Sequence, residues 1–145
     1  MQDKKYLDAT PEAGRDFYIN HQEGAVVMLN LLKFKAEADY EGLDHLAPDE
    51  PITGKEAYRE YMSETMPYLQ AAGSEVLFYG SSSAFVIGPA DESWDAVLLV
   101  KHASAAQFIA FAQNEDYLKI AGHRKAALED SRLLPIKELP LDLGQ

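Results

Sequence analysis

VVMLNLLKFK, residues 26–35, has the composition of a buried β-strand, rich in Val and Leu. Side chains along a strand alternate between its two faces, so even-numbered and odd-numbered residues point in opposite directions. Between residues 26 and 34, both sets are apolar apart from Asn30 and Lys33. A strand with two apolar faces needs a covering layer on each. This stretch therefore predicts a sheet that is packed on both sides.

The spacing of apolar residues and the positions of turn residues divide the rest of the chain into helices and strands. Helices are expected at residues 9–24, 53–73, 104–113 and 115–130. Further strands are expected at residues 74–80, 83–88, 94–102 and 131–139, the first two of them as a hairpin. Apart from additions such as the N-terminal helix, the order is β-α-β-β-α-β. That order predicts an α+β fold of the ferredoxin-like type.

Local sequence marks several ends of these elements. Thr10 is a suitable cap for the first helix, and Thr53 with Glu56 forms a capping box for the second. Pro67 is expected to kink the second helix, because proline has no N–H group and clashes with the preceding turn. Pro135 cannot donate a hydrogen bond to a neighbouring strand, which places the last strand at an edge of the sheet.

A single layer of helices covers only one face of such a sheet, so the other apolar face needs a second cover. Another copy of the chain is the simplest cover. We therefore expect a homodimer whose sheets pack face to face, as in a dimeric α/β barrel. The length of 145 residues suits one domain, which spans residues 1–145 with its core at 25–137.

Composition excludes several functional classes. The chain has no cysteine, which excludes a disulfide scaffold, a thiolate nucleophile and cysteine-ligated metal. Its formal charge of −11 repels nucleic acid and anionic lipid, so neither is expected as a partner. The polar N-terminal stretch and the absence of a long apolar run fit a cytoplasmic protein. No metal-binding motif, phosphate loop or dinucleotide fingerprint is present, so we expect neither a metal nor a cofactor.

Four segments carry a resemblance to a known family: VVMLNLLKF, TGKEAYREYM, WDAVLLVKH and EDYLKIAGHRKAALEDSRLLPI. They resemble the domain-of-unknown-function family numbered 1330, within the dimeric α/β-barrel superfamily, over roughly residues 25–137. The stretch HRKAALEDSRLLP is the most specific part. The family usually has Pro-Ser before the second helix, whereas this chain has His-Ala-Ser at 102–104, so no family role is carried onto His102.

The resemblance implies a ferredoxin-like fold and a homodimer, but no established reaction. Relatives in the superfamily include cofactor-free monooxygenases of aromatic compounds, lactone isomerases and haem enzymes. Because one fold hosts such different chemistry, the function has to be argued from individual residues.

Three candidate substrate-binding residues lie on elements that are otherwise apolar. Asn30 either holds a ligand carbonyl in a pocket or is satisfied by neighbouring backbone groups. Tyr58 and Tyr61 lie three residues apart on the helix face that meets the sheet. Their rings either fill the core or direct their hydroxyl groups into a cavity. Lys33 points away from Asn30 and is expected to end its strand in water.

His123 and Arg124 are the candidate catalytic residues. Consecutive helical residues point about 100° apart, so the two side chains face different surroundings. His123 has the side chain best suited to proton transfer near neutral pH. Arg124 either binds a substrate carboxylate or pairs with Asp95, Glu129 or Asp130 to hold its helix in place.

Two further candidates and one loop complete the set. Trp94 starts a strand and offers a ring for stacking, and His102 ends the same strand. The stretch at residues 36–53 is acidic and long for a loop in a compact domain. It is interpreted either as a lid over a cavity or as a solvated or dimer-contacting excursion.

These residues lead to two kinds of function. In one, the chain is an enzyme without a tightly held cofactor, resembling a monooxygenase or an isomerase, that acts on a small carbonyl or aromatic compound. In the other, it is a non-catalytic homodimer that binds a metabolite or has a purely structural role. A cavity of ligand size, about 300 Å³ or more, separates the ligand-binding alternatives from the purely structural one.

Overall fold

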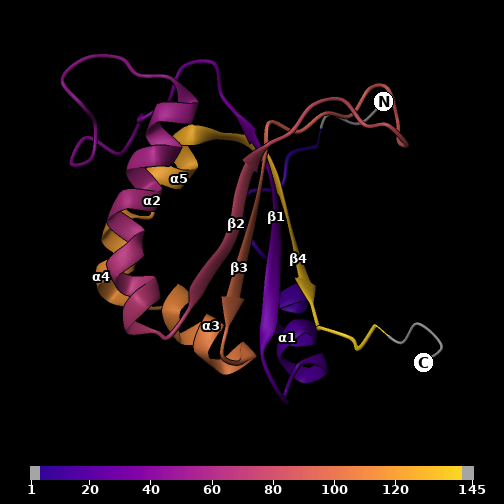
Figure 1. The fold of residues 1–145 in the computed structure, drawn as a ribbon. Coiled ribbons are helices and arrows are strands. Elements are labelled where there is room, and N and C mark those ends of the chain that lie inside the picture. Colours follow the sequence, from indigo (N-terminus) through magenta and orange to yellow (C-terminus); the bar gives the residue numbers. More distant parts are fainter. Residues whose placement is uncertain (1–3, 142–145) are drawn as a thin grey trace.

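The apolar stretch that contains Asn30 forms the central strand β1 (Val26–Phe34) of a four-stranded antiparallel sheet (Figure 1). It pairs with β3 (Ala96–His102) on one side and with β4 (Leu128–Ile136) on the other. β2 (Glu75–Ser81) pairs with β3, which gives the strand order β2-β3-β1-β4. The computed structural model describes residues 4–141. Its architecture confirms the predicted α+β, ferredoxin-like fold and the edge position of the last strand.

Five helices accompany the sheet in this part of the chain: α1 (Pro11–Asn20), α2 (Gly54–Ala71), α3 (Ala105–Ala112), α4 (Glu115–Ile120) and α5 (Gly122–Ala127). The predicted caps are present, because the Thr10 hydroxyl accepts from a backbone N–H and Thr53 forms a reciprocal capping box with Glu56. α2 continues past Pro67 to Ala71. In Figure 1, α2, α4 and α5 lie together on one side of the sheet.

Two element assignments from the sequence are wrong. Residues 83–88, expected as the second strand of a hairpin, lie in an irregular connection, and β2 pairs with β3 instead. The helix expected at 115–130 is divided into α4 and α5, and residues from Leu128 onward belong to β4. The apolar spacing had predicted that the helix continues to residue 130. Instead, Leu128 pairs with Phe34 of the neighbouring strand, and this strand pairing takes the place of the helical hydrogen bonds.

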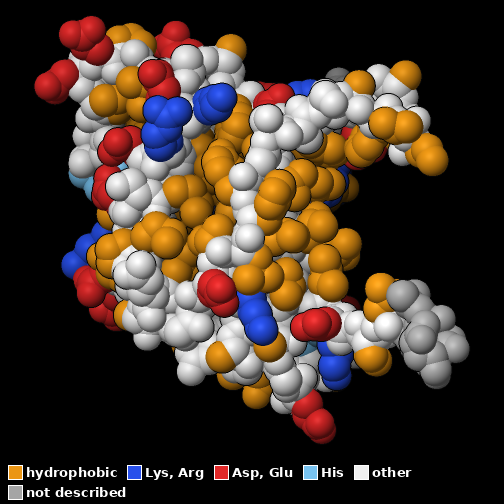
Figure 2. All heavy atoms as spheres, in the orientation of Figure 1, with side chains coloured by type: hydrophobic (Ala, Val, Ile, Leu, Met, Phe, Trp, Pro, Cys, Tyr) orange, Lys and Arg blue, Asp and Glu red, His pale blue; other side chains and the backbone are white. Residues whose placement is uncertain are grey.

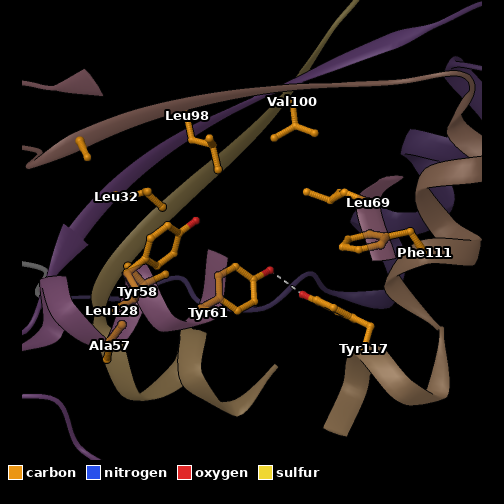
Figure 3. Close-up of a cluster of buried hydrophobic side chains, with 12 residues drawn as sticks. Leu32, Ala57, Tyr58, Tyr61, Leu69, Leu98, Val100, Phe111, Tyr117 and Leu128 are labelled. Atoms are coloured by element: carbon orange, nitrogen blue, oxygen red, sulfur yellow. Dashed lines mark hydrogen bonds between the residues drawn. The ribbon is translucent and has the colours of Figure 1, made fainter. Parts of the chain in front are cut away.

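The side chains of β1 alternate between two faces, as predicted, and the even-numbered ones face the helices. Leu32 is fully buried there, in a core cluster that also contains Tyr58 and Tyr61 of α2 and Tyr117 of α4 (Figure 3). The hydroxyl groups of Tyr61 and Tyr117 lie 2.7 Å apart and are hydrogen-bonded. Burying these large rings between sheet and helices supplies much of the apolar stabilisation of the core.

The odd-numbered side chains of β1 lie on the opposite face, which no helix in the described part of the chain covers in Figure 1. Leu134 of β4 and Phe78 of β2 belong to the same face and are 57% and 55% exposed. Figure 2 shows hydrophobic side chains gathered along this open side of the sheet. We call this surface the open sheet face.

Two segments project beyond the open sheet face, one at each end in Figure 1. The connection at residues 82–95 carries Val86 and Ile87, which are 99% and 92% exposed. The C-terminal segment carries Leu139 and Leu141, which are 78% and 84% exposed. Both segments therefore present large apolar side chains to solvent. Within the described residues, no helix has the length and apolar character needed to span a membrane.

Candidate functional site

A half-open pocket of about 610 Å³ lies between the loop at residues 36–53 and α2. We call it the loop pocket. Its wall is formed by ten residues: Tyr40, His45, Leu46, Pro48, Ile52, Glu56, Arg59, Glu60, Glu64 and His123. The volume is within the range of small-molecule sites. Of the candidates named from the sequence, only His123 lines this pocket.

Backbone hydrogen bonds and a close approach at a glycine hold the loop in place. The Ala38 N–H donates to Ile52 and the Asp39 N–H donates to Ala126, so the base of the loop is tied to itself and to α5. A Cβ atom on Gly122 would lie 2.8 Å from a methyl group of Leu46. Glycine at the start of α5 therefore lets the loop pack closely beside His123.

His123 is almost completely buried and is held at both ring nitrogens. Nδ1 lies 2.7 Å from the Tyr40 hydroxyl, and Nε2 lies 3.2 Å from a carboxylate oxygen of Glu64. An ionised carboxylate only accepts hydrogen bonds, so Nε2 carries the hydrogen. In a neutral ring Nδ1 then accepts from the Tyr40 O–H group. We call Glu64, His123 and Tyr40 the relay residues.

The loop pocket has a negative electrostatic character. Burial raises the pKa of the Tyr40 hydroxyl, and the charges of Glu60 and Glu64 raise it further. Three glutamates line the wall against one arginine, Arg59. Tyr40 therefore stays protonated at neutral pH unless its proton is transferred directly to a neighbouring base.

Comparison with known families identifies the group to which the chain is related. A family model described as "Domain of unknown function (DUF1330)" matches residues 49–137. The chain belongs to the DUF1330 family. The match includes α2 and α5, which carry two of the relay residues, Glu64 and His123, and begins after the loop residue Tyr40.

Two solved structures are similar to this DUF1330 protein over nearly its whole length. A crystal structure of the RPA0582 protein of Rhodopseudomonas palustris, described as of unknown function, is 35% identical, with a TM-score of 0.82. It covers 95% of this chain and 100% of its own. A crystal structure of methylated RPA0582 protein is 34% identical, with a TM-score of 0.82, covering 97% and 98%.

A more distant structure supports the fold alone. A Dabb family protein from Mesorhizobium loti, described as having a ferredoxin-like fold, is 12% identical with a TM-score of 0.51. The alignment covers 81% of this DUF1330 chain and 100% of the other. No protein with a curated description matches the chain.

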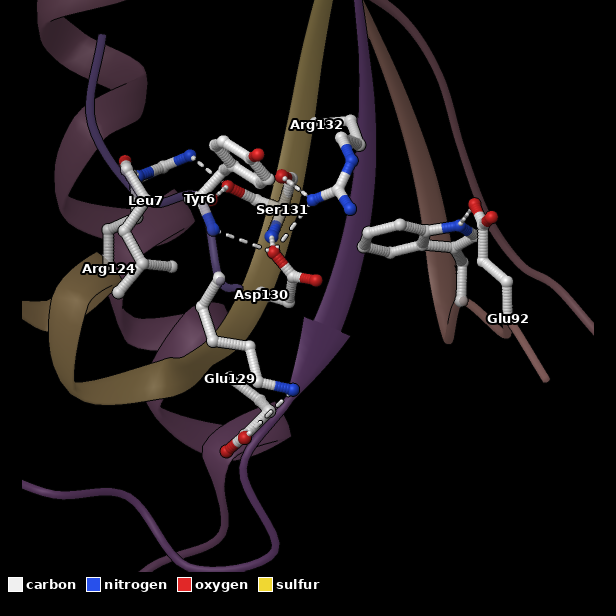
Figure 4. A network of polar contacts seen from close by, with 10 residues as sticks. Tyr6, Leu7, Glu92, Arg124, Glu129, Asp130, Ser131 and Arg132 are labelled. Atoms are coloured by element: carbon white, nitrogen blue, oxygen red, sulfur yellow. Dashed lines mark hydrogen bonds and ion pairs between the residues drawn. The ribbon is translucent and has the colours of Figure 1, made fainter. Parts of the chain in front are cut away.

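Arg124 of this DUF1330 protein lies outside the loop pocket, in a polar network along β4 (Figure 4). Its guanidinium donates to the Leu7 carbonyl oxygen at 2.7 Å and to the Ser131 hydroxyl at 3.3 Å. Among the described residues no carboxylate forms an ion pair with it, unlike the structural alternative drawn from the sequence. Arg124 instead fixes the N-terminal segment against β4.

In this network Asp130 forms an ion pair with Arg132. One interpretation of the sequence had expected Asp130 as a partner of Arg124. Arg132 donates to Asp130 at 2.8 Å, and its guanidinium lies over the rings of Tyr6 and Trp94 at 4.7 and 4.9 Å. Burial alone would raise the pKa of Asp130. Hydrogen bonds from the N–H groups of Tyr6 and Ser131, together with Arg132, outweigh burial and lower it. Trp94 thus stacks on an arginine of its own chain.

Asn30 faces the helices, which places it on the core side of the sheet. Its side-chain amide donates to the Leu98 carbonyl at 3.2 Å and to the Met28 carbonyl at 3.4 Å. These are the neighbouring backbone partners that one interpretation of the sequence expected. Lys33 points the other way, with its ammonium 3.4 Å from the Ser93 hydroxyl.

Tyr58 and Tyr61 lie in the core. The Tyr58 ring packs against Phe34, Tyr61 and Tyr79, with ring centroids 5.5, 5.2 and 6.5 Å away. Burial raises the pKa of both hydroxyl groups far above the usual value, so both remain protonated. Their rings fill the space between α2 and the sheet rather than the wall of the loop pocket.

His102 lies under α3, away from His123. Its Nδ1 is 2.7 Å from the Ser74 hydroxyl, and its ring packs against Phe108 and Phe111. Burial lowers the pKa of this imidazole to about 4. At neutral pH His102 is therefore an uncharged core residue.

The sequence interpretation did not identify Tyr40 and Glu64 as partners of His123. The acidic loop was recognised as a lid candidate, but its tyrosine was not singled out. A detectable signal was the spacing of Glu56, Glu60 and Glu64, which places three carboxylates on one stripe of α2. Among residues 4–141, no group of three or more His, Asp or Glu side chains is placed to hold a metal ion.

Proposed function

We propose that this DUF1330 protein binds a small molecule in the loop pocket and transfers a proton through Tyr40 and His123. The observation that carries the proposal is the chain of contacts from Glu64 through His123 to Tyr40, at 3.2 and 2.7 Å, at the wall of a pocket of about 610 Å³. Nucleophile or acid–base residues oriented by a histidine and a carboxylate recur on unrelated folds.

Each relay residue has a defined part. Tyr40 donates its hydrogen to Nδ1, which leaves an oxygen lone pair free to accept a proton from a ligand. As the ligand loses that proton to the Tyr40 oxygen, the Tyr40 hydrogen passes to Nδ1. The imidazolium that forms lies against the Glu64 carboxylate, which stabilises its charge. The raised pKa of Tyr40 favours this coupled transfer over formation of a free tyrosinate.

Isomerisation of a small carbonyl compound is the reaction class that this arrangement fits best. A base removes a proton from the carbon beside the carbonyl, and after exchange with solvent a proton is returned to the substrate at another position. No second reactant is needed, so atoms and electrons balance within one substrate. A monooxygenase or a non-catalytic binding protein is the alternative. A monooxygenase needs oxygen as a second reactant, and a binding protein makes no use of the relay.

Exchange of carbon-bound hydrogen tests the proposal directly. We expect the protein to accelerate deuterium uptake into one or more of cyclohexanone, acetophenone and aminoacetone in D₂O, followed by proton NMR. His123→Gln removes the base and should abolish the acceleration, whereas His21→Gln, which alters a histidine outside the pocket, should keep it. Uptake no faster than in buffer for all three compounds would show that the relay does not act as a base on them.

We also propose that the chain forms a homodimer through the open sheet face. A specific observation favours this: apolar side chains of three neighbouring strands lie on that face, including Leu99 opposite Leu29 and Leu134 on the other side of Leu29. Monomers rarely leave so large an apolar surface in water. When a two-fold axis between the two sheets relates two chains, the open sheet face of one chain contacts the same face of the other.

The two projecting segments extend this surface. Val86 and Ile87 at one end, and Leu139 and Leu141 at the other, have little cover within their own chain. In a dimer with sheets face to face, both segments reach toward the partner. Their apolar side chains would then be buried at the ends of the interface, which gives a reason for their exposure in one chain.

A further inference from the structure

We infer that the ligand of the loop pocket is a small organic cation, an ammonium or amidinium group attached to an apolar body. The inference rests on the loop pocket being the ligand site, as proposed above, and adds the chemical class of its ligand. It is carried by the charge distribution around the pocket, by the side chains that the loop contributes, and by the hydrogen-bonding state of Tyr40.

One wall of the pocket is a stripe of carboxylates. Glu56, Glu60 and Glu64 follow each other at intervals of four residues along α2, so their side chains are neighbours on one face. Like charges at this spacing repel each other and destabilise a helix. A cation placed between them would remove that repulsion, whereas an anion would add to it.

Glu60 is the carboxylate that is free to bind such a cation. Glu64 is 3.2 Å from the imidazole of His123, and Glu56 accepts from the backbone N–H and hydroxyl of Thr53. Within residues 4–141, no side chain is hydrogen-bonded or ion-paired to Glu60. Its charge nevertheless acts on the pocket, because it contributes to the raised pKa of Tyr40.

Arg59, the arginine that lines the loop pocket, does not cancel the negative charge around Tyr40. Arg59 lies beside Glu56, whose pKa is lowered first by its hydrogen bonds to Thr53 and then by the charge of Arg59. The charge of Arg59 thus acts on Glu56 and on the Tyr79 hydroxyl, which lies outside the loop pocket. Glu60 and Glu64, nearer to the relay, keep the region around Tyr40 negative.

The loop contributes mostly apolar and aromatic side chains to the pocket, beside the imidazole of His45. Leu46, Pro48 and Ile52 line the pocket, together with the ring of Tyr40. The Tyr40 ring stands edge-on to the His123 ring, at 82° and with a centroid distance of 5.6 Å. Apolar side chains would accommodate a hydrocarbon body, and an aromatic face attracts a cation. A ligand with an apolar body and a positive end matches both the loop side chains and the carboxylates.

The hydrogen bonds of Tyr40 agree with this class. In a neutral His123 ring whose Nε2 donates to Glu64, the Tyr40 hydroxyl donates its hydrogen to Nδ1, which lies 2.7 Å from the oxygen. The oxygen therefore presents an acceptor to the pocket. The carboxylate of Glu60 is an acceptor as well. An ammonium or amidinium group, which only donates, satisfies both acceptors at once.

Three probes of nearly equal shape and different charge test the inference. Benzylamine, benzyl alcohol and benzoate are titrated into the ¹⁵N-labelled protein, and amide shifts at Tyr40, Leu46 and His123 report on the pocket. We expect benzylamine to bind at least about tenfold more tightly than benzyl alcohol and benzoate to be weakest. Glu60→Gln should weaken benzylamine by about tenfold and leave benzyl alcohol unchanged.

Glu23→Gln is the matched control, because it removes the same charge from an exposed position outside the pocket. It should bind benzylamine as the wild-type protein does. Equal weakening by both variants, or shifts scattered over the surface, would mean general attraction to an acidic protein and would overturn the inference. Equal affinity for all three probes, or preference for benzoate, would overturn it too.

These outcomes are separate from those of the deuterium exchange experiment. Exchange of the neutral ketones that depends on His123, together with no preference for benzylamine, would retain the proposed proton transfer and reject the cation. A benzylamine preference that depends on Glu60, without any exchange, would retain the ligand class and leave a binding protein. No shift at the pocket with any probe would reject the ligand class.

Discussion

The hydroxyl oxygen of Tyr40 lies 2.7 Å from Nδ1 of His123, although 83 positions separate the two residues in the sequence. Tyr40 belongs to the loop at residues 36–53 and His123 to α5. Their hydrogen bond therefore fastens a long loop to a helix of the core. It also places a proton acceptor behind the Tyr40 hydroxyl group, which lines the loop pocket.

Tyr40→Phe should loosen the loop without unfolding the domain. Removing the hydroxyl deletes one hydrogen bond to a buried imidazole, which costs about 1 kcal/mol. We expect faster amide hydrogen exchange at residues 40–48 and a correspondingly small drop in unfolding free energy. Tyr18→Phe is the control, because Tyr18 is exposed on α1. Equal exchange rates in the two variants would show that the loop is held by other contacts.

Gly54→Ala should destabilise the fold strongly, because the position has no room for a Cβ atom. Such an atom would lie 2.6 Å from the Ala127 carbonyl oxygen and would also meet the backbone of Lys35. Backbone atoms cannot rotate away, so we expect a loss of about 2 kcal/mol or more in chemical denaturation.

Gly14→Ala is the matched control, because a Cβ there meets nothing within 4 Å and the residue lies within α1. Alanine in a helix should instead stabilise by about 0.5–1 kcal/mol. A similar effect of the two substitutions would contradict the close approach of the Gly54 position to Lys35, just after β1, and to Ala127 of α5.

Local chemistry made much of the fold predictable. The alternation along β1 correctly identified two apolar faces, because the side-chain period of a strand is fixed by its geometry. Caps such as Thr53 with Glu56 involve residues three apart and were correctly placed for the same reason. Residues 83–88 were misassigned, because a short apolar run resembles a strand whether or not a partner strand lies beside it.

The site was less predictable, because its contacts join distant residues. His123 could be named from its chemistry, but its neighbours Tyr40 and Glu64 depend on how the loop closes over α2. Arg124 was expected to meet a substrate or a carboxylate, and it meets the Leu7 carbonyl instead. Every residue has a backbone carbonyl, so the residue types alone do not indicate which carbonyl a distant side chain will contact.

His102 should make the protein less stable as the pH falls. Its pKa is lowered from 6.5 to about 4 by burial, so the unfolded chain takes up a proton before the folded protein does. The contribution is fully present above pH 6.5 and is lost as the pH falls toward 4. Between pH 7 and pH 5 the loss from this residue should be about 2 kcal/mol.

Urea denaturation of His102→Gln at these two pH values checks the expectation. The variant should lose less stability than the wild-type protein on going from pH 7 to pH 5, since its side chain does not titrate. His45→Gln, at an exposed position, should behave as the wild-type protein does. An unchanged pH dependence in His102→Gln would mean that this histidine is not held in its neutral form.

Leu134→Asp should separate the proposed dimer. The side chain is 57% exposed on the open sheet face of one chain, and a carboxylate there would be buried against the partner. We expect a dimer for the wild-type protein and a folded monomer for the variant in sedimentation velocity. Leu118→Asp, at a leucine that is 54% exposed on α4, should remain dimeric. A monomeric wild-type protein would contradict the proposed interface.

The hydrogen bonds between the N-terminal segment and β4 set an order on folding during synthesis. The Tyr6 N–H donates to Asp130, and its carbonyl accepts from Ser131, so these contacts span 124 and 125 positions. The segment around Tyr6 therefore cannot take its native place until Asp130 and Ser131 have left the ribosome. Until β4 has emerged, the growing chain can hold only β1, β2 and β3, with one edge of its central strand unpaired. Translation must pass residue 131 before that edge is closed.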